Sequence, residues 1–135
     1  MYPRVDKPGP AAERIGKECS CSISKPSSLP SRAATDAWAS FYGEDAEWIE
    51  YRHFSPPSAP NRMIGRERIR EFIEGVLRAG VRIEISDELV STDRAAFRVT
   101  ASLADGRQII EHVMIWSDGK RVTRQVDVEA WDPEP

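Results

Sequence analysis

Cysteine and histidine are scarce in this sequence, and their positions argue against a disulfide framework or a metal site. The two cysteines, Cys19 and Cys21, are separated by a single serine, and such close neighbours rarely reach disulfide geometry. The two histidines, His53 and His112, have no metal-ligand spacing to the cysteines or to each other. We therefore expect free thiols, no metal and no cofactor.

The chain also lacks an excess of basic charge and any long apolar run. Its 135 residues include 19 Lys and Arg against 22 Asp and Glu, and the basic residues are scattered, whereas a binder of phosphate backbones concentrates them. No stretch approaches the roughly 18–20 apolar residues that span a bilayer, and the N-terminus has no apolar core of a signal peptide. We expect a cytoplasmic protein with no nucleic-acid partner and no membrane partner.

Proline is absent from the long stretch between Asn61 and Asp132. Because proline removes a backbone donor and fixes φ, this stretch is where continuous helix and sheet can run. Residues 1–30 hold five prolines and many serines, which predicts a loose arm with at most a short helix at 11–18. Residues 31–132 are expected to form one compact domain.

Hydrophobic periodicity in this domain predicts helices first and a run of strands afterwards. One helix is expected from Ser31, and a second over Arg66–Ala79 with Gly80 as its cap. The segment 55–63 is expected to be a loop. Strands are expected at 46–54, 81–90, 95–104, 107–117 and 121–131, with Asp-Gly hairpins at 105–106 and 118–119. This order predicts an α+β fold in which two to three helices cover a curved antiparallel sheet, leaving a cone that can hold a small ligand.

Two sequence motifs stand out in this domain, the run Phe41–Glu50, which reads FYGEDAEWIE, and the run Gly65–Phe72, which reads GRERIREF. These motifs resemble those of the SnoaL-like and ketosteroid-isomerase-like branch of the nuclear-transport-factor-2-like (NTF2-like) superfamily. Together with the two hairpins, their order and spacing match that family over roughly residues 33–132. The resemblance implies the cystatin-like cone of that family, a fold that hosts isomerases, cyclases, dehydratases and binders without activity.

The resemblance also implies chemical roles for two acids. The carboxylate that shuttles the proton in ketosteroid isomerases lies five residues after the Asp of the DA pair, which is Glu50 here. A second acid, kept protonated as a hydrogen-bond donor, lies in an I-D-H triplet that corresponds to Ile110-Glu111-His112. Independently of the family, alternation places Glu50 on one strand face with Trp48 and Arg52, and Glu111 interrupts an apolar row.

Two hypotheses follow for the function. In the first, the chain is a cofactor-independent isomerase, cyclase or dehydratase with Glu50 as general base and Glu111 as hydrogen-bond donor. In the second, it is a non-catalytic ligand-binding or dimerisation module in which Arg52 or Arg124 neutralises the acids. The residues expected to line the cavity with Glu50 and Glu111 are Trp38, Trp48, Arg52, Phe72, Val99, Ala101, Leu103, Val113, Arg124, Val126 and Val128.

The expected partners are a small organic molecule and a second copy of the chain. Arg52 and Arg124 favour a polar or anionic ligand over a steroid. The outer face of the sheet is expected to carry an apolar row on one strand, and such a row is a common interaction site. The row consists of Ile110, His112, Met114 and Trp116.

Overall fold

The structure is a computed structural model that describes residues 32–135, and this part contains two helices and six strands. The elements are, in chain order, α2 (Arg32–Ala39), β1 (Tyr42–Tyr51), β2 (Asn61–Ile64), α3 (Arg66–Arg78), β3 (Arg82–Val90), β4 (Arg94–Ser102), β5 (Gln108–Ser117) and β6 (Val122–Trp131). The arm predicted for residues 1–30, with its short helix at 11–18, lies outside the described residues.

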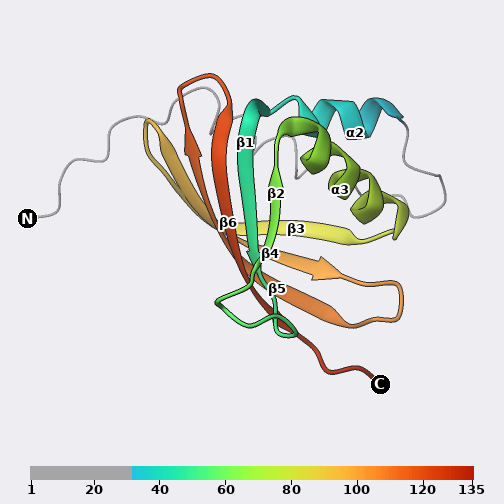
Figure 1. The fold of residues 1–135 in the computed structure, drawn as a ribbon. Helices are drawn as coiled ribbons and strands as arrows, with labels where there is room; N and C mark the ends of the chain where they lie inside the picture. The colour runs from blue at the N-terminus through green and yellow to red at the C-terminus, as the bar shows by residue number, and fades with distance from the viewer. Residues whose placement is uncertain (1–31) are drawn as a thin grey trace, which may run out of the picture.

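All six strands belong to one strongly curved sheet, with the two helices on its concave side (Figure 1). The strand order is β2-β1-β6-β5-β4-β3, so the last four strands form the predicted meander. Neighbouring strands are antiparallel, with the exception of β1 and β6. These two are parallel, because the last strand of the meander, β6, lies beside β1 and runs in the same direction. The α+β fold is therefore confirmed, with one parallel pair that alternation alone does not reveal.

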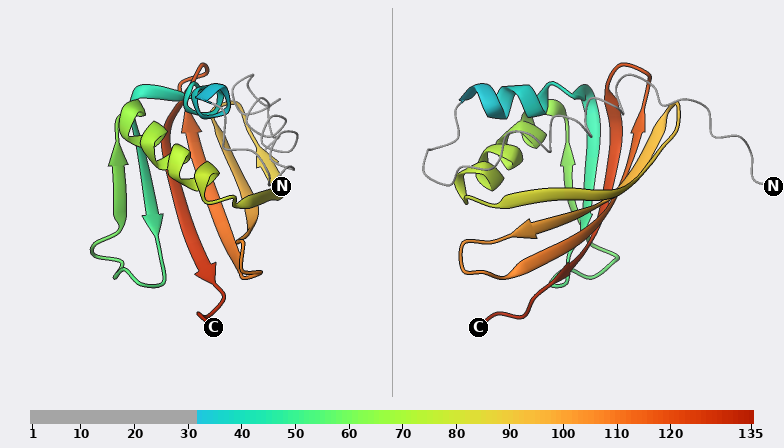
Figure 2. Two further views of the ribbon diagram at one scale, coloured as in Figure 1. Left: turned by 90° about the vertical axis from the view of Figure 1, so that its right-hand side faces the viewer. Right: turned by 180° about the vertical axis from the view of Figure 1, so that it is seen from behind.

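Helix α3 lies against the concave side of the sheet together with α2, as the views from the side and from behind show (Figure 2). Its apolar stripe buries Ile69 and Ile73 completely, as the periodicity predicts. The helix ends at Arg78, and Gly80 follows it with φ 67°, a left-handed conformation that glycine adopts without a steric penalty. No helix within residues 32–135 is long and apolar enough to cross a membrane.

Two predicted boundaries near the N-terminal end of the domain are wrong. Strand β1 begins at Tyr42 instead of residue 46, because α2 stops at Ala39 and the chain enters the sheet at once beside β6. The predicted loop at 55–63 contains the start of β2, which pairs antiparallel with β1 from Asn61 onward. The prolines of this segment end at Pro60, so nothing prevents the residues after it from pairing at the sheet edge.

A one-residue bulge near the start of β6 decides which side chains of this strand face the helices. Trp116 of β5 is opposite Arg124, but the next residue, Ser117, is opposite Val122, so Thr123 is an extra residue. An extra residue moves all later side chains of a strand to the other face. Val122 is thus buried in the core, while Arg124 after the bulge is exposed on the convex face.

Candidate functional site

A cavity of about 410 Å³ lies between the concave face of the sheet and helix α3. Its walls are mostly apolar and come from α2, α3 and every strand except β2. The aromatic part of the wall consists of Trp38, Tyr42, Trp48, Phe72, Phe97 and Trp131. The polar side chains that reach the cavity are Glu50, Arg52, Glu71, Glu111, Gln125 and Glu129.

Ten of the residues that the sequence suggests for the site surround this cavity. The two acids, Glu50 and Glu111, both line it, from β1 and β5. The other eight are Trp38, Trp48, Arg52, Phe72, Val99, Ala101, Leu103 and Val113.

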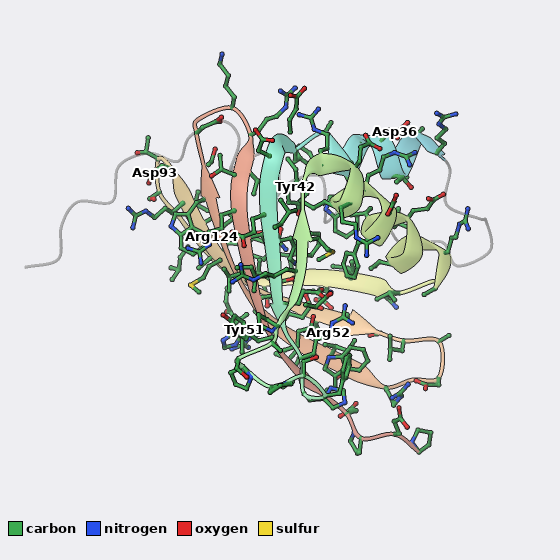
Figure 3. All side chains as sticks on the ribbon, in the orientation of Figure 1. Asp36, Tyr42, Tyr51, Arg52, Asp93 and Arg124 are labelled. Atoms are coloured by element: carbon green, nitrogen blue, oxygen red, sulfur yellow. The ribbon has the colours of Figure 1, made fainter. Side chains whose placement is uncertain are left out.

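Three predicted lining residues, Arg124, Val126 and Val128, do not contribute to the cavity. The bulge at Thr123 places these even-numbered residues of β6 on the convex face, where Val128 is 51% exposed. The Arg124 guanidinium lies 5.0 Å from the Trp116 ring centroid, so it does not pair with Glu50 or Glu111. Figure 3 shows Arg52 and Arg124 on opposite sides of the sheet.

Strand register brings four carboxyl groups together on the concave side. Glu50 of β1 is beside Asp127 of β6, and Glu111 of β5 is opposite Glu129 of β6. Glu50 is 2% exposed and Asp127 is completely buried. Like charges at directly opposed positions of a sheet destabilise it, so this cluster is not an ordinary structural pairing. In particular, Glu111 has no arginine opposite it on either neighbouring strand.

Each of three acids in the cluster has hydrogen-bond donors of its own. Glu50 accepts hydrogen bonds through Oε2 from the Arg52 guanidinium and, at 2.9 Å, from the amide of Asn61. Glu129 accepts one from the indole N–H of Trp131, at 2.7 Å. The fourth acid, Glu111, has no hydrogen-bond partner among residues 32–135.

Asp127 lies behind the cavity wall and joins several wall residues. Its two carboxylate oxygens accept hydrogen bonds from Trp48 Nε1 at 2.8 Å and from Gln125 Nε2 at 2.9 Å. The Gln125 amide oxygen in turn accepts one from the Tyr42 hydroxyl. The Tyr42 and Trp48 rings are stacked with centroids 5.7 Å apart, so this network fixes one aromatic wall of the cavity.

Burial raises the pKa of three acids in the cluster, Glu111, Glu129 and Asp127. Burial, and then the charges of Glu129 and Glu50, raise the pKa of Glu111 to about 8, although Arg52 opposes the shift. Burial raises the pKa of Glu129 to about 7, and the charge of Glu50 adds to the effect, although the hydrogen bond from Trp131 and the charge of Arg52 oppose it. Burial also raises the pKa of Asp127 well above its ordinary value, against the hydrogen bonds that it accepts.

Arg52 is the single cationic side chain that lines the cavity within the part of the chain that the structure describes. Its guanidinium carbon lies 5.5 Å from the Phe54 ring centroid and 5.7 Å from that of Phe72, both within cation–π range. Its terminal nitrogen is bonded to Glu50, while Nε is buried without a hydrogen-bond partner. Arg52 Nε lies 3.9 Å from Glu129 Oε2, so the guanidinium forms ion pairs with two acids of the wall, Glu50 and Glu129.

Three of these acids lie as close together as the ligands of a metal ion would. Carboxylate oxygens of Glu50, Asp127 and Glu129 lie within 4.8 Å of one another. Both oxygens of Asp127 already accept hydrogen bonds, and Arg52 already pairs with Glu50. The donor set is thus engaged by protein groups and does not fit a metal.

The residues at the site that the sequence pattern does not predict are Gln125, Asp127 and Glu129 of β6, and also Asn61. The valines at 122, 126 and 128 dominate the pattern of this strand and suggest that the even positions face inward. Recognition of the bulge would have reversed this assignment, but the sequence carries no glycine or other clear signal for it.

Solved structures with the same fold are numerous. A candidate ketosteroid isomerase from Kribbella flavida is 18% identical, with a TM-score of 0.65 over 94% of this chain and 84% of its own. An NTF2-like protein of unknown function from Mesorhizobium loti is 19% identical, with a TM-score of 0.62 over 72% of this chain and 78% of its own. A de novo designed protein with a curved β-sheet is 12% identical, with a TM-score of 0.64 over 91% of this chain and 86% of its own.

At these identities the structural matches establish the fold alone, since one of the proteins was designed and another has no known function. A comparison with curated protein sequences gave no significant match. The model of the SnoaL-like domain, however, matches residues 31–123, which is well over half of the chain. The cavity under α3, the six-stranded curved sheet and this match agree, and the chain belongs to the SnoaL-like family of the NTF2-like superfamily.

Proposed function

We propose that the protein binds a small organic molecule in this cavity and moves a proton on a carbon next to a carbonyl group, as an isomerase, cyclase or dehydratase. The observation that carries the proposal is that Glu50 and Glu111 line one largely apolar cavity. A general base and a proton-bearing donor in the same dry site are what this reaction requires.

The two acids differ in the way the reaction needs. Glu50 accepts hydrogen bonds from Arg52 and Asn61, which suit its carboxylate form, and it takes the proton from carbon. The electron pair of the broken C–H bond moves into the carbonyl group and forms an enolate. Glu111, whose pKa is about 8, keeps its proton at neutral pH and donates a hydrogen bond to the enolate oxygen. Return of the proton from Glu50 to another carbon completes an isomerisation.

Exchange of hydrogen for deuterium tests this proposal without knowledge of the natural substrate. Proton NMR in D₂O follows the loss of α-hydrogen signals from a panel of small ketones. We expect the protein to accelerate exchange, Glu50→Gln to abolish it, and Glu111→Gln to slow it by on the order of ten- to a thousandfold. Glu84→Gln, at an exposed position of β3, is the matched control and should have no effect. Unchanged exchange in Glu50→Gln would contradict the role of this residue as the base.

A non-catalytic binding module is the second candidate, and the contact between Arg52 and Glu50 favours it. In this second candidate the Glu50 carboxylate holds the Arg52 guanidinium at the cavity wall and takes no proton from carbon. This candidate predicts that ketones bind in the cavity, measured by quenching of tryptophan fluorescence, without any accelerated exchange.

We also propose that two copies of the chain associate through the convex face of the sheet. Met114 of β5 is 43% exposed there and Val128 of β6 is 51% exposed, next to His112. Exposed apolar side chains on a sheet face are a common basis for association. The cytoplasmic location expected from the sequence stays a prediction.

A further inference from the structure

The protein holds Glu50 through only one of its two carboxylate oxygens. Oε2 accepts hydrogen bonds from the Arg52 guanidinium and, at 2.9 Å, from the side-chain amide of Asn61. Oε1 accepts none from any N–H or hydroxyl group of residues 32–135. In this part of the chain Arg52 Nε is the one buried side-chain nitrogen or oxygen without a partner, so Oε1 keeps some exposed surface. Because Glu50 lines the cavity, Oε1 is the oxygen that a ligand can reach.

Arg52 alone does not determine how the Glu50 carboxylate is turned. Its guanidinium is bonded to Glu50, and its Nε lies 3.9 Å from Oε2 of Glu129, so it forms ion pairs with both acids. A cation between two carboxylates is attracted to each of them, and an arginine side chain has many rotamers. A second donor that contacts only Glu50 is therefore needed to fix one orientation of this carboxylate.

Asn61 is such a donor, and its place on the backbone is well defined. It is the first residue of β2 and lies opposite Glu50 in the antiparallel pairing of β1 with β2. Its side chain is short, and because a carboxylate only accepts hydrogen bonds, the amide nitrogen must face Glu50. No residue of β2 lines the cavity, so Asn61 can influence a ligand there only through Glu50.

We infer that Asn61 is a positioning residue that, together with Arg52, holds Oε2 of Glu50 and so makes Oε1 the atom that takes the proton. The inference rests on the proposed function, because Asn61 has this role only if Glu50 is the base. In the step concerned, the bond between carbon and hydrogen breaks and Oε1 binds the proton. The electron pair moves into the carbonyl group, which becomes an enolate, while both hydrogen bonds to Oε2 stay in place.

The effect of losing Asn61 should appear in the rate of proton transfer and not in ligand binding. A misplacement of a reacting group by about 1 Å can cost on the order of a hundredfold in rate. Binding of a ketone depends on the cavity wall, to which Asn61 does not belong. A residue that only supports the fold would instead change rate and binding together.

Two variants of Asn61 separate the hydrogen bond from the shape of the side chain. Asn61→Asp keeps the shape but replaces the donor by a second acceptor, which repels the Glu50 carboxylate. Asn61→Leu keeps approximately the volume and has no polar group. Ile64→Ala is the matched control, because Ile64 lies at the other end of β2 and is 67% exposed.

The assay is the exchange of α-hydrogens in D₂O with the full chain and the panel of small ketones, to which benzylacetone belongs. Rates are measured over a range of concentrations for the ketone that the parent exchanges fastest. We expect both Asn61 variants to lower the maximal rate by about 10- to 100-fold. Affinity for the same ketone, measured by quenching of tryptophan fluorescence, should stay within about twofold of the parent. Ile64→Ala should match the parent in both measurements.

The outcomes separate this inference from the proposed function. If the parent accelerates exchange and both Asn61 variants do so equally well, Asn61 is not a positioning residue and the proposed function stands. If Asn61→Asp keeps the rate of the parent and only Asn61→Leu loses it, shape matters and not the donor, which refutes the inference. A parallel loss of rate and affinity would refute it as well, because it indicates a structural role. Asn61→Asp decides the matter if the melting temperature shows that Asn61→Leu does not fold. If the parent exchanges no ketone of the panel, the proposed function fails and this inference fails with it.

Discussion

Replacement of Glu111 by glutamine should stabilise the protein, and the gain should depend on pH in a defined way. The ordinary pKa of this carboxyl group is 4.5, and burial with Glu129 and Glu50 nearby raises it to about 8 in the folded state. Between these values the unfolded chain has lost the proton that the folded chain retains, so stability falls as pH rises from about 4.5 to about 8. At about 1.4 kcal/mol per pH unit, the full loss is about 5 kcal/mol.

The glutamine variant removes this loss, because its amide carries no titratable proton and keeps the shape of the side chain. No hydrogen bond is sacrificed, since the Glu111 carboxyl has no hydrogen-bond partner among residues 32–135. The expected gain in the free energy of unfolding is below about 1 kcal/mol at pH 5, about 3 kcal/mol at pH 7 and about 5 kcal/mol above pH 8.

Urea denaturation followed by tryptophan fluorescence measures this free energy at each pH from 5 to 9. Glu84→Gln, at an exposed position of β3, is the control and should stay within about 0.5 kcal/mol of the parent at every pH. A gain that is independent of pH would show that packing is responsible instead of the proton. A loss of stability at pH 8 would refute the reasoning, because it would mean that Glu111 is held by a stabilising charge interaction.

Three further predictions concern the ion pair, the N-terminal arm and the convex face. Arg52→Gln should lower the free energy of unfolding by about 3–5 kcal/mol, because it leaves the buried Glu50 carboxylate without its cation. Urea denaturation measures this loss, and a value below about 1 kcal/mol would contradict the prediction. Deletion of residues 1–30, which have few apolar anchors, should lower the melting temperature by only a few degrees; a larger loss in calorimetry would show that the arm belongs to the fold. Light scattering at micromolar concentration should give the mass of a dimer, and Met114→Lys should give a monomer, whereas a monomeric parent would refute association.

The fold could be predicted from local signals because they agree with one another along most of the chain. The apolar stripe of α3, the glycine after it and the two Asp-Gly turns each indicate the same element boundaries, and the structure confirms them to within a few residues. The errors lie where pairing between distant strands decides the outcome. Strand β2 is short and follows three prolines, and the early start of β1 depends on its parallel partner β6, which is 80 residues away at Tyr42↔Val122.

The candidate site could be predicted only in part, for a related reason. Glu50 and Glu111 were indicated by the resemblance to ketosteroid isomerases, and the regular alternation around each of them agrees with a place on the inner face. Asp127 and Glu129 were missed because the bulge at Thr123 reverses the parity of β6, and its valines then suggest the wrong inner face. Because of this one extra residue, the sequence pattern did not predict two of the four carboxyl groups in the cluster.

The reversed orientation of the β6 side chains indicates which residues of this strand serve function. Beyond the bulge, β6 turns Gln125, Asp127 and Glu129 toward the concave side and leaves Val128 exposed, which is the opposite of what folding stability favours. A strand that breaks the hydrophobic pattern at such a cost is expected where function, and not stability, constrains the residues. The curved sheet and its covering helices provide the space, but this fold hosts many different activities and is also found in a designed protein. The inner row of β6 is therefore expected to serve function: replacement of Asp127 and Glu129 by apolar residues should keep the cone and raise stability at alkaline pH, where burial of these carboxyl groups is most costly.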